Sequence, residues 1–564
     1  MGEENVLGIS CHYHDSAAAV LKEGELEAAA EEERFTRQKH DNSFPEKAAE
    51  YCLERAGLEK KDIDTVVFHE KPVKKFGRIM QTFIETFPRG YRYFRQSLPE
   101  WVNRKLMVRG RIREFMGEEF EGEIKFSEHH ISHASAAYMP SPFEEAAVLT
   151  VDGVGESTTT AIFDAEGNSI EMVKKIEFPD SLGLLYSTVT SFLGFMVNND
   201  EYKVMGLAPY GEPEYLEKLK EEVFHLEEDG SFTMNMEYFS FRHSRKMWSE
   251  KFEEEFGKPR EKGEELTERD KNLAASLQKL TEETVQKLAE EAKRVTGKDN
   301  LCMSGGVALN SASNGKLRQK DIFENIWIQP AATDAGDALG AAQYYHHHVK
   351  DNPRNYQMED VYLGPEYSEK EIENALEESG LEYQKLGEEE KVEKVAELLE
   401  EGKVVSLFQG RLEWGPRALG NRSILADPRD SSMVGRVNKK VKFREEFRPF
   451  APTVLEDRAE EVFDMEGESP YMLFVFDVRD GWKEKIPAVT HVNGTSRIQT
   501  IREDINRDYY RIIEKFGERT GVPVVLNTSF NVKGEPIVNT PENAVECFRN
   551  SGMDYMLMEN FLVG

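Results

Sequence analysis

The sequence predicts an α/β protein of two domains, and the first domain contains an internal duplication. Its 564 residues exceed what one hydrophobic core usually holds together. The same order of strand, polar loop, strand and hairpin occurs twice in the first third of the chain. The polar segment 351–355 has the composition of a linker and precedes further helices and a buried strand. We therefore expect one domain over residues 1–355 and a second over residues 362–564.

Both copies of the repeat are predicted from short apolar runs separated by turn signals. The first copy has strands at 6–10, 17–21 and 25–31, and the second has strands at 146–151, 158–163 and 170–176. A polar loop, 11–16 or 152–156, joins the first two strands of each copy. Actin-like ATPases and sugar kinases are built from two such halves and hold nucleotide phosphates at the two loops. The pattern therefore predicts a duplicated domain with a cleft between its halves.

A second glycine-rich turn lies later in this domain. Apolar residues at helical spacing from Leu273 to Val295 predict a helix that ends at Gly297. The short buried strand 301–303 then runs into Gly305 and Gly306 before another helix. Such a turn lets backbone N–H groups approach a phosphate or a ribose, although tight turns also use glycine for steric reasons alone. The chain has no Walker A motif, which excludes a P-loop enzyme.

Composition excludes several classes of protein. The net charge of −33 argues against wholesale binding of nucleic acid. No apolar run approaches the ~20 residues of a membrane helix, and the acidic N-terminus does not resemble a signal peptide. The four cysteines form no C-x-x-C pair, which favours a reducing cytoplasm. We therefore expect a cytoplasmic protein without a membrane partner.

The stretch 71–113 reverses the charge balance. It contains twelve Lys or Arg against Glu85 and Glu100, with seven aromatic residues interleaved. One interpretation is a site for an anionic substrate or RNA. The other is a helical insertion with solvated charges and a buried aromatic side.

Two histidines and two aspartates are candidate metal ligands. His129 and His133 are four residues apart and share one face of a helix, whereas His130 is rotated away by ~100°. Such a pair is explained equally well by core packing. Asp152 follows a predicted strand, and a turn before a helix offers Asp334 or Asp337. This donor set suits Fe, Mn or Zn better than Ca.

The second domain has a basic signature of another kind. Arginines and lysines occur among Gly, Pro and aromatic residues in the segments 411–423 and 436–452, and Arg497 and Asn527 follow later. Rigid neighbours distinguish this pattern from a solvated basic face, so it predicts a pocket for a phosphate.

Eight motifs in a fixed order resemble one enzyme family. They occupy residues 14–19, 33–41, 129–134, 151–156, 201–211, 304–310, 414–423 and 447–452. Over nearly its whole length the chain resembles the O-carbamoyltransferases of the nodulation, cephamycin and aminoglycoside tailoring type. The resemblance implies an actin-like (ASKHA) domain similar to the tRNA threonylcarbamoyl transferase. It also implies a YrdC-like α+β domain similar to threonylcarbamoyl-AMP synthase.

The resemblance also implies a reaction. Carbamoyl phosphate and ATP, the latter with Mg, would give carbamoyl-adenylate and pyrophosphate in the C-terminal domain. The N-terminal domain would pass the carbamoyl group to a hydroxyl of a small acceptor such as a sugar or a natural product. The partners expected are thus carbamoyl phosphate, ATP and this acceptor, and a homodimer is one oligomeric state considered.

Site residues carried over from the family fall into four groups. The catalytic residues expected are His14, Asp15 and Lys39, with His14 or Asp15 as base. The metal ligands expected are His129, His133, Asp152 and Asp334, with Fe favoured over Mn or Zn, and Asp337 is the other candidate for the fourth position. The nucleotide-binding residues expected are Gly153, Gly155, Lys203, Met205, Gly206, Gly305, Gly306 and Asn310. The residues expected to bind carbamoyl phosphate are Arg417, Lys442, Arg448, Arg497 and Asn527.

Three alternative functions explain fewer of these features. An actin-like small-molecule kinase explains the duplication but neither the two histidines nor the second anion pocket. A tRNA-modifying threonylcarbamoyl-type enzyme would use the basic stretch 71–113 as an RNA platform. A non-catalytic nucleotide-binding scaffold does not account for two candidate sites.

Overall fold

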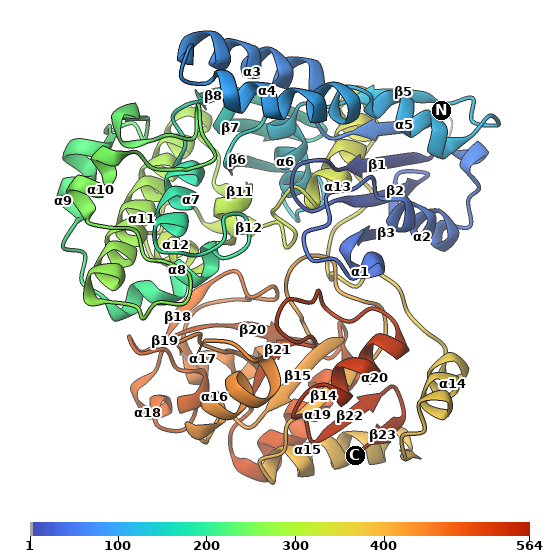
Figure 1. The fold of residues 1–564 in the computed structure, drawn as a ribbon. Coiled ribbons are helices and arrows are strands. Elements are labelled where there is room, and N and C mark those ends of the chain that lie inside the picture. Colours follow the sequence, from blue (N-terminus) through green and yellow to red (C-terminus); the bar gives the residue numbers. More distant parts are fainter. Residues whose placement is uncertain (1–3, 446) are drawn as a thin grey trace. The chain divides into compact units, whose positions relative to one another are not determined.

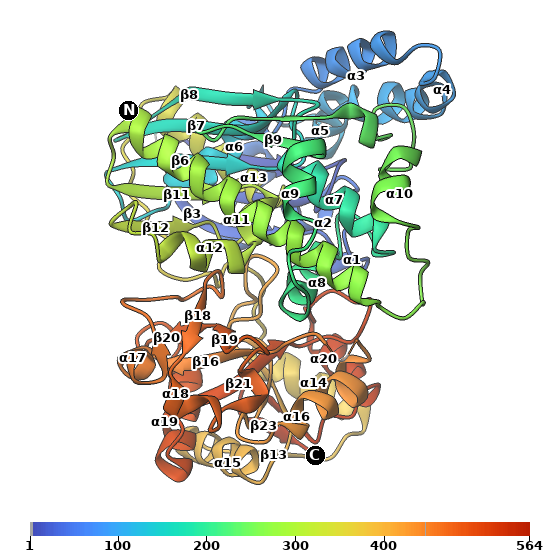
Figure 2. The ribbon, with the colours of Figure 1, turned by 90° about the vertical axis from the view of Figure 1, so that its left-hand side faces the viewer.

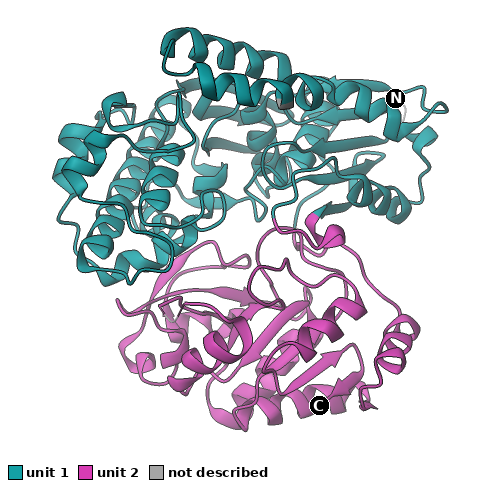
Figure 3. Ribbon diagram, in the orientation of Figure 1, with its two compact units in different colours: residues 1–32, 40–358 teal, residues 33–39, 359–564 magenta. Residues whose placement is uncertain are grey.

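The structure, a computed structural model, describes residues 4–445 and 447–564. The chain forms two compact units, shown in Figure 3. Unit 1 extends to Glu32 and resumes over His40–Met358, whereas unit 2 comprises Glu33–Lys39 and Glu359–Gly564. The sequence predicts one boundary, near the linker 351–355, and does not predict that Glu33–Lys39 belongs to the second unit. No helix in the described part of the chain is both long and apolar enough to cross a membrane.

The first sheet of unit 1 has five strands in the order β3-β2-β1-β4-β5. Its strands are β1 (Val6–Ser10), β2 (Ala17–Lys22), β3 (Glu25–Glu31), β4 (Thr65–Phe68) and β5 (Glu123–Phe126). The first three strands pair antiparallel, whereas β4 pairs parallel to β1 and β5 pairs parallel to β4. The middle strands are buried on both faces, as their continuous apolar sequences predict.

The second sheet repeats this topology, with the order β12-β11-β6-β7-β8. Its strands are β6 (Glu145–Val151), β7 (Thr158–Glu166), β8 (Ser169–Glu177), β11 (Asn300–Ser304) and β12 (Asn325–Ile328). Again the first three strands pair antiparallel and the two later strands pair parallel. The predicted duplicated actin-like domain is therefore confirmed, because two sheets with the same connectivity arise from separate segments of the chain.

Two helices form the layer between the sheets, as Figures 1 and 2 show. α6 (His129–Tyr138) packs on β6 and β11, and α13 (Gly336–Gln343) packs on β1 and β2. The two helices also make extensive contact with each other. Gly340 makes this possible, because a Cβ at that position would lie 1.9 Å from the carbonyl oxygen of Ser132. The close approach brings the start of α6 and the start of α13 together.

The remaining helices of unit 1 are α2 (Glu46–Ala56), α3 (Pro72–Thr86), α4 (Tyr91–Glu100), α5 (Val108–Met116), α7 (Leu182–Phe192), α8 (Glu201–Leu207), α9 (Leu216–Lys218), α10 (Glu250–Phe256), α11 (Glu268–Thr296) and α12 (Ser311–Arg318). Of these helices, α2 packs on β2 and β3, and α11 packs on β6 and β7. A small hairpin, β9 (Phe224–Leu226) and β10 (Phe232–Met234), lies among them. The long helix α11 ends at Gly297, as predicted, and this glycine has the left-handed conformation. It begins before the predicted stretch, at a capping box of Thr267 and Asp270.

Unit 2 is an α+β domain around an eight-stranded mixed sheet of order β13-β23-β22-β14-β15-β21-β16-β20. These strands are β13 (Tyr383–Lys385), β14 (Val405–Phe408), β15 (Arg422–Ala426), β16 (Ala451–Leu455), β20 (Gln499–Ile501), β21 (Val524–Ser529), β22 (Tyr555–Met558) and β23 (Phe561–Val563). A smaller sheet contains β17 (Phe463–Asp464), β18 (Val475–Val478) and β19 (Thr495–Arg497). The helices are α1 (Glu33–Thr36), α14 (Glu369–Ser379), α15 (Glu388–Glu400), α16 (Ser432–Arg436), α17 (Ala459–Val462), α18 (Asp480–Lys483), α19 (Arg507–Thr520) and α20 (Pro541–Arg549).

One predicted basic residue of unit 2 is part of the core. Arg422 is fully buried and its guanidinium lies 3.8 Å from the centre of the Phe408 ring. It donates hydrogen bonds to the carbonyl oxygens of Gln409 and Pro365. Because both terminal nitrogens of Arg422 donate to backbone carbonyl oxygens of unit 2, this residue contributes to the fold.

Candidate functional site

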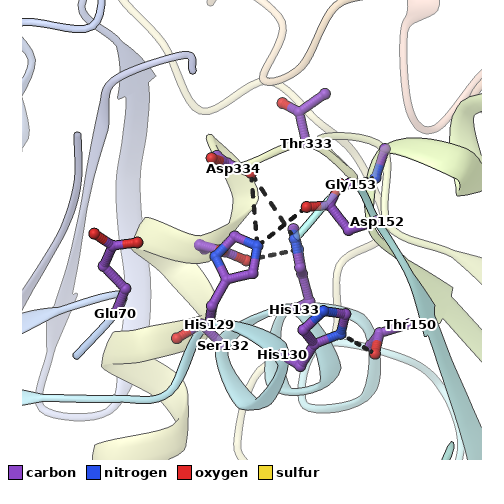
Figure 4. A network of polar contacts seen from close by, with 12 residues as sticks. Glu70, His129, His130, Ser132, His133, Thr150, Asp152, Gly153, Thr333 and Asp334 are labelled. Carbon is purple, nitrogen blue, oxygen red and sulfur yellow. Dashed lines mark hydrogen bonds and ion pairs between the residues drawn. The ribbon is translucent and has the colours of Figure 1, made fainter. Parts of the chain in front are cut away.

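The first turn of α6 carries the two histidines into the interior of unit 1. His129 is the first residue of the helix, and its backbone N–H lies 3.2 Å from both carboxylate oxygens of Glu156. His129 and His133 are fully buried, and their ring centres are 4.5 Å apart. His130 points elsewhere, as predicted, and its Nδ1 lies 2.7 Å from the Thr150 hydroxyl (Figure 4).

The two carboxylates at the start of α13 approach different nitrogens of these rings. Asp337 lies 3.1 Å from Nδ1 of His129 and 2.7 Å from Nδ1 of His133. Asp334 Oδ1 instead lies 3.9 Å from Nε2 of His129 and 4.0 Å from Nε2 of His133. The latter distances are too long for hydrogen bonds but suit donors that share one ion. Asp337 therefore faces the Nδ1 atoms of both rings, while Asp334 faces their Nε2 atoms.

Asp152 joins the same cluster from the end of β6 and connects it to both glycine loops. Its Oδ2 lies 3.2 Å from His129 Nε2, and its Oδ1 accepts a hydrogen bond of 3.1 Å from the backbone N–H of Gly306. Gly305 has a φ of +92°, and a Cβ there would lie 2.4 Å from the Val151 carbonyl oxygen. A Cβ at Gly155 would lie 2.8 Å from His129 Cδ2. Gly155 is thus required for the close approach of its loop to His129, and Gly305 for the close approach of its turn to the end of β6.

The cluster fits a divalent transition metal. His133 Nε2 and Asp334 Oδ2 are buried and have no hydrogen-bond partner in the part of the chain that the structure describes. Burial raises the pKa of Asp334, so an isolated carboxylate there is costly, and a cation would restore its charge. Two imidazoles with one or two carboxylates match Fe, Mn or Zn chemistry. His129, His133, Asp334 and Asp337 place one donor atom each within 4.8 Å of one another.

A second histidine cluster lies on the first polar loop of unit 1. Asp15 bridges two imidazoles, because its Oδ2 lies 2.8 Å from His14 Nδ1 and its Oδ1 lies 2.7 Å from His40 Nδ1. His14 Nε2 contacts the carbonyl oxygen of Asn198, and His40 Nε2 lies 2.7 Å from the side-chain oxygen of Asn199. Both nitrogens of His14 therefore face acceptors, and its ring is a double donor.

We expect His14 to be an imidazolium at neutral pH. Burial alone lowers the pKa of His14, but the charge and hydrogen bond of Asp15 outweigh it and raise the pKa to about 10. Because the pKa rises on folding, the resulting stabilisation is complete below pH ~6.5 and is lost as the pH rises through about 10. Titration of the ring by NMR should give an alkaline midpoint, and Asp15→Asn should return it below pH 7. A midpoint near 6.5 in the wild-type protein would contradict this arrangement.

The remaining residues predicted to bind nucleotide lie on α8, at the N-cap of α12 and on the loop after β6. Lys203, Met205 and Gly206 belong to α8, and the Met205 sulfur lies 3.8 Å from the hydroxyl of Ser311 at the start of α12. Lys203 Nζ lies 3.0 Å from Asp200. Asn310 caps α12 by accepting from the backbone N–H of Ser313, and it also pairs with Gln278. Gly153 has open space where a Cβ would be. Nucleotide binding by these residues stays a prediction.

In unit 2, Arg417, Arg444 and Arg448 lie near Arg497, which has no acidic partner among the described residues. Burial lowers the pKa of Arg497 well below its usual value, and Arg417, Arg444 and Arg448 lower it further. Arg497 has no ion pair or hydrogen bond through its side chain among residues 4–445 and 447–564. Converging guanidinium groups of this kind favour a bound anion.

Asn527 has a hydrogen-bonding atom left for a ligand, whereas Lys442 has none. Asn527 on β21 donates to Gln499 and Thr453, but its buried Oδ1 has no hydrogen-bond partner among the described residues. Lys442 Nζ lies 2.8 Å from the carbonyl oxygens of Ser529 and Asn531 and 2.6 Å from the Asn531 side-chain oxygen. An ammonium has three N–H groups, so these contacts use all of them. Contact of Lys442 with carbamoyl phosphate stays a prediction.

Lys39 and Arg34 belong to unit 2, whereas His14 and Asp15 belong to unit 1. Lys39 lies close enough to Lys442 to lower its pKa, although burial and Arg444 are larger causes. Arg34 is buried and donates to the carbonyl oxygen of Gly415. Because these residues belong to different units, the grouping of Lys39 with His14 and Asp15 stays a prediction.

Several site residues were missed by the sequence interpretation. His69 Nδ1 lies 3.2 Å from Asp337, and Glu156 holds the backbone N–H groups of His129 and Lys71. His40 completes the cluster with Asp15. His69 directly follows the buried strand β4, which is the signal that identified Asp152 after β6. His40 and Glu156 lie within the motifs 33–41 and 151–156, but their roles depend on contacts between distant segments, which the motifs do not specify.

Comparisons with known proteins identify the family of the chain. A family model described as "Carbamoyltransferase N-terminus" matches residues 5–343, and one described as "Carbamoyltransferase C-terminus" matches residues 396–564. The chain is 44% identical to the Synechocystis protein sll1178, with 99% of this chain and 96% of that protein covered. It is 37% identical to nodulation protein NolNO of Sinorhizobium fredii, with 98% of this chain and 79% of that protein covered.

Among solved structures, component A of the (R)-2-hydroxyglutaryl-CoA dehydratase of Acidaminococcus fermentans has 16% identity and a TM-score of 0.32. The alignment covers 60% of this chain and 97% of that one. The assignment of the fold rests on the strand order described above. The two family matches span both units, and on this basis the chain belongs to the carbamoyltransferase family and is an enzyme that transfers a carbamoyl group.

Proposed function

We propose that the enzyme makes carbamoyl-adenylate from carbamoyl phosphate and ATP and then carbamoylates a hydroxyl of a small-molecule acceptor. Carbamoyl phosphate would first lose phosphate to water, giving carbamate. The carbamate oxygen would attack the α-phosphate of ATP, displacing pyrophosphate. The acceptor hydroxyl would attack the carbamoyl carbon, releasing AMP and a proton.

The observation that carries this proposal is the arginine cluster of unit 2. Arg497, which lacks an acidic partner among the described residues, provides donors for a phosphate together with Arg417 and Arg448. The buried Oδ1 of Asn527 can accept a hydrogen bond from a carbamoyl NH₂ group. Donors for an anion together with one acceptor for an amide are the complement of carbamoyl phosphate.

The metal-type cluster of unit 1 supports the transfer step. His129, His133, Asp152 and Asp334 would hold a divalent metal, which would supply positive charge to the adenylate phosphate as AMP leaves. Asp337 would keep both imidazoles in one tautomer, with their Nε2 atoms free to bind. Identification of the metal as Fe remains part of this proposal.

The acceptor's proton needs a base, and His14 is not one in the arrangement described. Its two ring nitrogens both donate, to Asp15 and to the Asn198 carbonyl. His14 would become a base once it has lost its proton and its Nε2 has left that carbonyl. Until then, the Asp15–His14 pair would orient the acceptor hydroxyl by hydrogen bonding.

The function is tested by incubating the enzyme with ATP, Mg²⁺ and carbamoyl phosphate without an acceptor. We expect release of pyrophosphate and a carbamoyl-adenylate detectable by mass spectrometry, both dependent on carbamoyl phosphate. A small-molecule kinase would need ATP and an acceptor only, and would form no pyrophosphate. Absence of adenylate with the metal supplied would refute the proposed route.

A further inference from the structure

The helical insertion 72–116, formed by α3, α4 and α5, has a tip that the proposed function does not use. α3 and α4 lie side by side at the outer edge of unit 1 in both views (Figures 1 and 2). Phe83 of α3 stacks on Phe94 of α4 with ring centres 4.2 Å apart, and Phe76 lies 6.3 Å from Trp101. These contacts account for the inward aromatic side chains. We call residues 84–95, which include the connecting turn, the hairpin tip.

Apolar side chains are exposed at the hairpin tip. Ile84, Phe87 and Tyr91 are 69%, 63% and 48% exposed. The structure exposes thirteen large hydrophobic side chains among its described residues, and six of them lie between residues 73 and 107. Single exposed hydrophobic residues are ordinary, but a local concentration marks an interaction site. The tip is therefore more than a solvated loop.

Basic side chains at the tip also lack partners. Arg89, Arg92 and Arg95 are exposed, and none forms a side-chain hydrogen bond or ion pair within the described ranges 4–445 and 447–564. By contrast, Lys71 and Lys74 at the start of α3 contact Glu128. The acid of the tip, Glu85, contacts Arg242.

We propose that the hairpin tip docks on a lipid bilayer surface that carries anionic headgroups. Arginines beside exposed aliphatic and aromatic side chains suit such a surface, because the charges contact headgroups while the apolar groups enter the boundary beneath them. The whole chain has a net charge of −33, so an anionic surface repels the protein outside the tip. The tip would therefore set a single orientation of the protein on the bilayer. The expectation of no membrane partner rested on the lack of a spanning helix. A peripheral contact with a bilayer surface needs no such helix.

Two other occupants fit the tip less well. If two copies met tip to tip, the arginines of both would face one another, and like charges repel. The exposed large hydrophobic residues outside the insertion, such as Met196, Val349 and Val492, are dispersed over separate segments of the described chain. They offer no concentrated apolar segment to which the tip of a second copy would bind. RNA would be bound by stacking and phosphate contacts, to which Ile84 contributes nothing.

The test is sedimentation of the full chain with vesicles of phosphatidylcholine, with or without phosphatidylglycerol. We expect binding only to the vesicles that contain phosphatidylglycerol, and weaker binding as salt increases. The combined change Arg89→Gln, Arg92→Gln and Arg95→Gln should weaken binding about 100-fold, at about fivefold per arginine. Ile84→Ser with Phe87→Ser should weaken it about tenfold or more, because the inserted apolar surface is lost.

The matched control is Val173→Ser with Val492→Ser, which removes two exposed apolar side chains outside the insertion. This control should bind vesicles like the wild-type chain, and all variants should form carbamoyl-adenylate at the wild-type rate. The proposal is overturned if the wild-type chain fails to bind anionic vesicles or if the tip variants bind as it does. It is also overturned if the tip variants abolish self-association or RNA binding while vesicle binding is absent.

Discussion

His129→Ala should abolish carbamoyl transfer while carbamoyl-adenylate formation continues. His129 Nε2 lies 3.2 Å from Asp152 and 3.9 Å from Asp334, so its removal takes away the donor common to both carboxylates. We expect a loss of about 10³-fold or more in the transfer rate, because a metal contributes several kcal/mol of charge stabilisation and ~1.4 kcal/mol is tenfold. Bound metal, measured by elemental analysis, should fall in parallel. Pyrophosphate release, assigned to unit 2, should be unchanged.

The adjacent histidine provides the control. His130 is also buried on α6, but its Nδ1 contacts Thr150, and burial, with the charges of His129 and His133, lowers its pKa to about 3. His130→Gln should therefore retain the metal and the transfer activity, at some cost in stability. Wild-type metal content in His129→Ala would contradict the assignment. An equal loss of transfer in both variants would indicate that packing of α6, and not metal binding, is disturbed.

The second large effect is expected for Arg497→Met. Loss of a guanidinium from the arginine cluster should raise the KM for carbamoyl phosphate by about 10²- to 10³-fold, as for charged donors to a buried anion. Transfer from synthetic carbamoyl-adenylate should remain, since unit 1 is unaltered. Kinetics of pyrophosphate release against carbamoyl phosphate concentration provide the measurement.

Stability separates a binding role of Arg497 from a structural one. Arg417, Arg444 and Arg448 disfavour its charge, and no acid among the described residues forms an ion pair with Arg497. Without ligand, Arg497→Met should leave the thermal midpoint equal or raise it, because like-charge repulsion is relieved. Arg497→Lys should restore part of the affinity, since the charge remains but the planar fork does not. A marked fall in the thermal midpoint would identify a structural arginine, as Arg422 is.

The strands and helices that the sequence predicts have local signals. Buried strands such as β1 and β11 are short apolar runs, and α11 ends at the glycine expected to end it. The duplicated topology followed from the repeated order of these runs. The pairing of His129 with His133 also followed from sequence, because a spacing of four residues places two side chains on one helix face.

What the sequence by itself determined was thus the fold class, the family and the histidine pair, all of which depend on neighbours within one element or on ordered motifs. Only the tertiary structure placed Asp334 against the Nε2 atoms and Asp337 against the Nδ1 atoms, because both carboxylates precede or begin the same helix. It also showed that the Lys442 ammonium donates to the carbonyl oxygens of Ser529 and Asn531 in its own unit. Such roles depend on which atoms distant segments bring together, and residue type and spacing do not specify that.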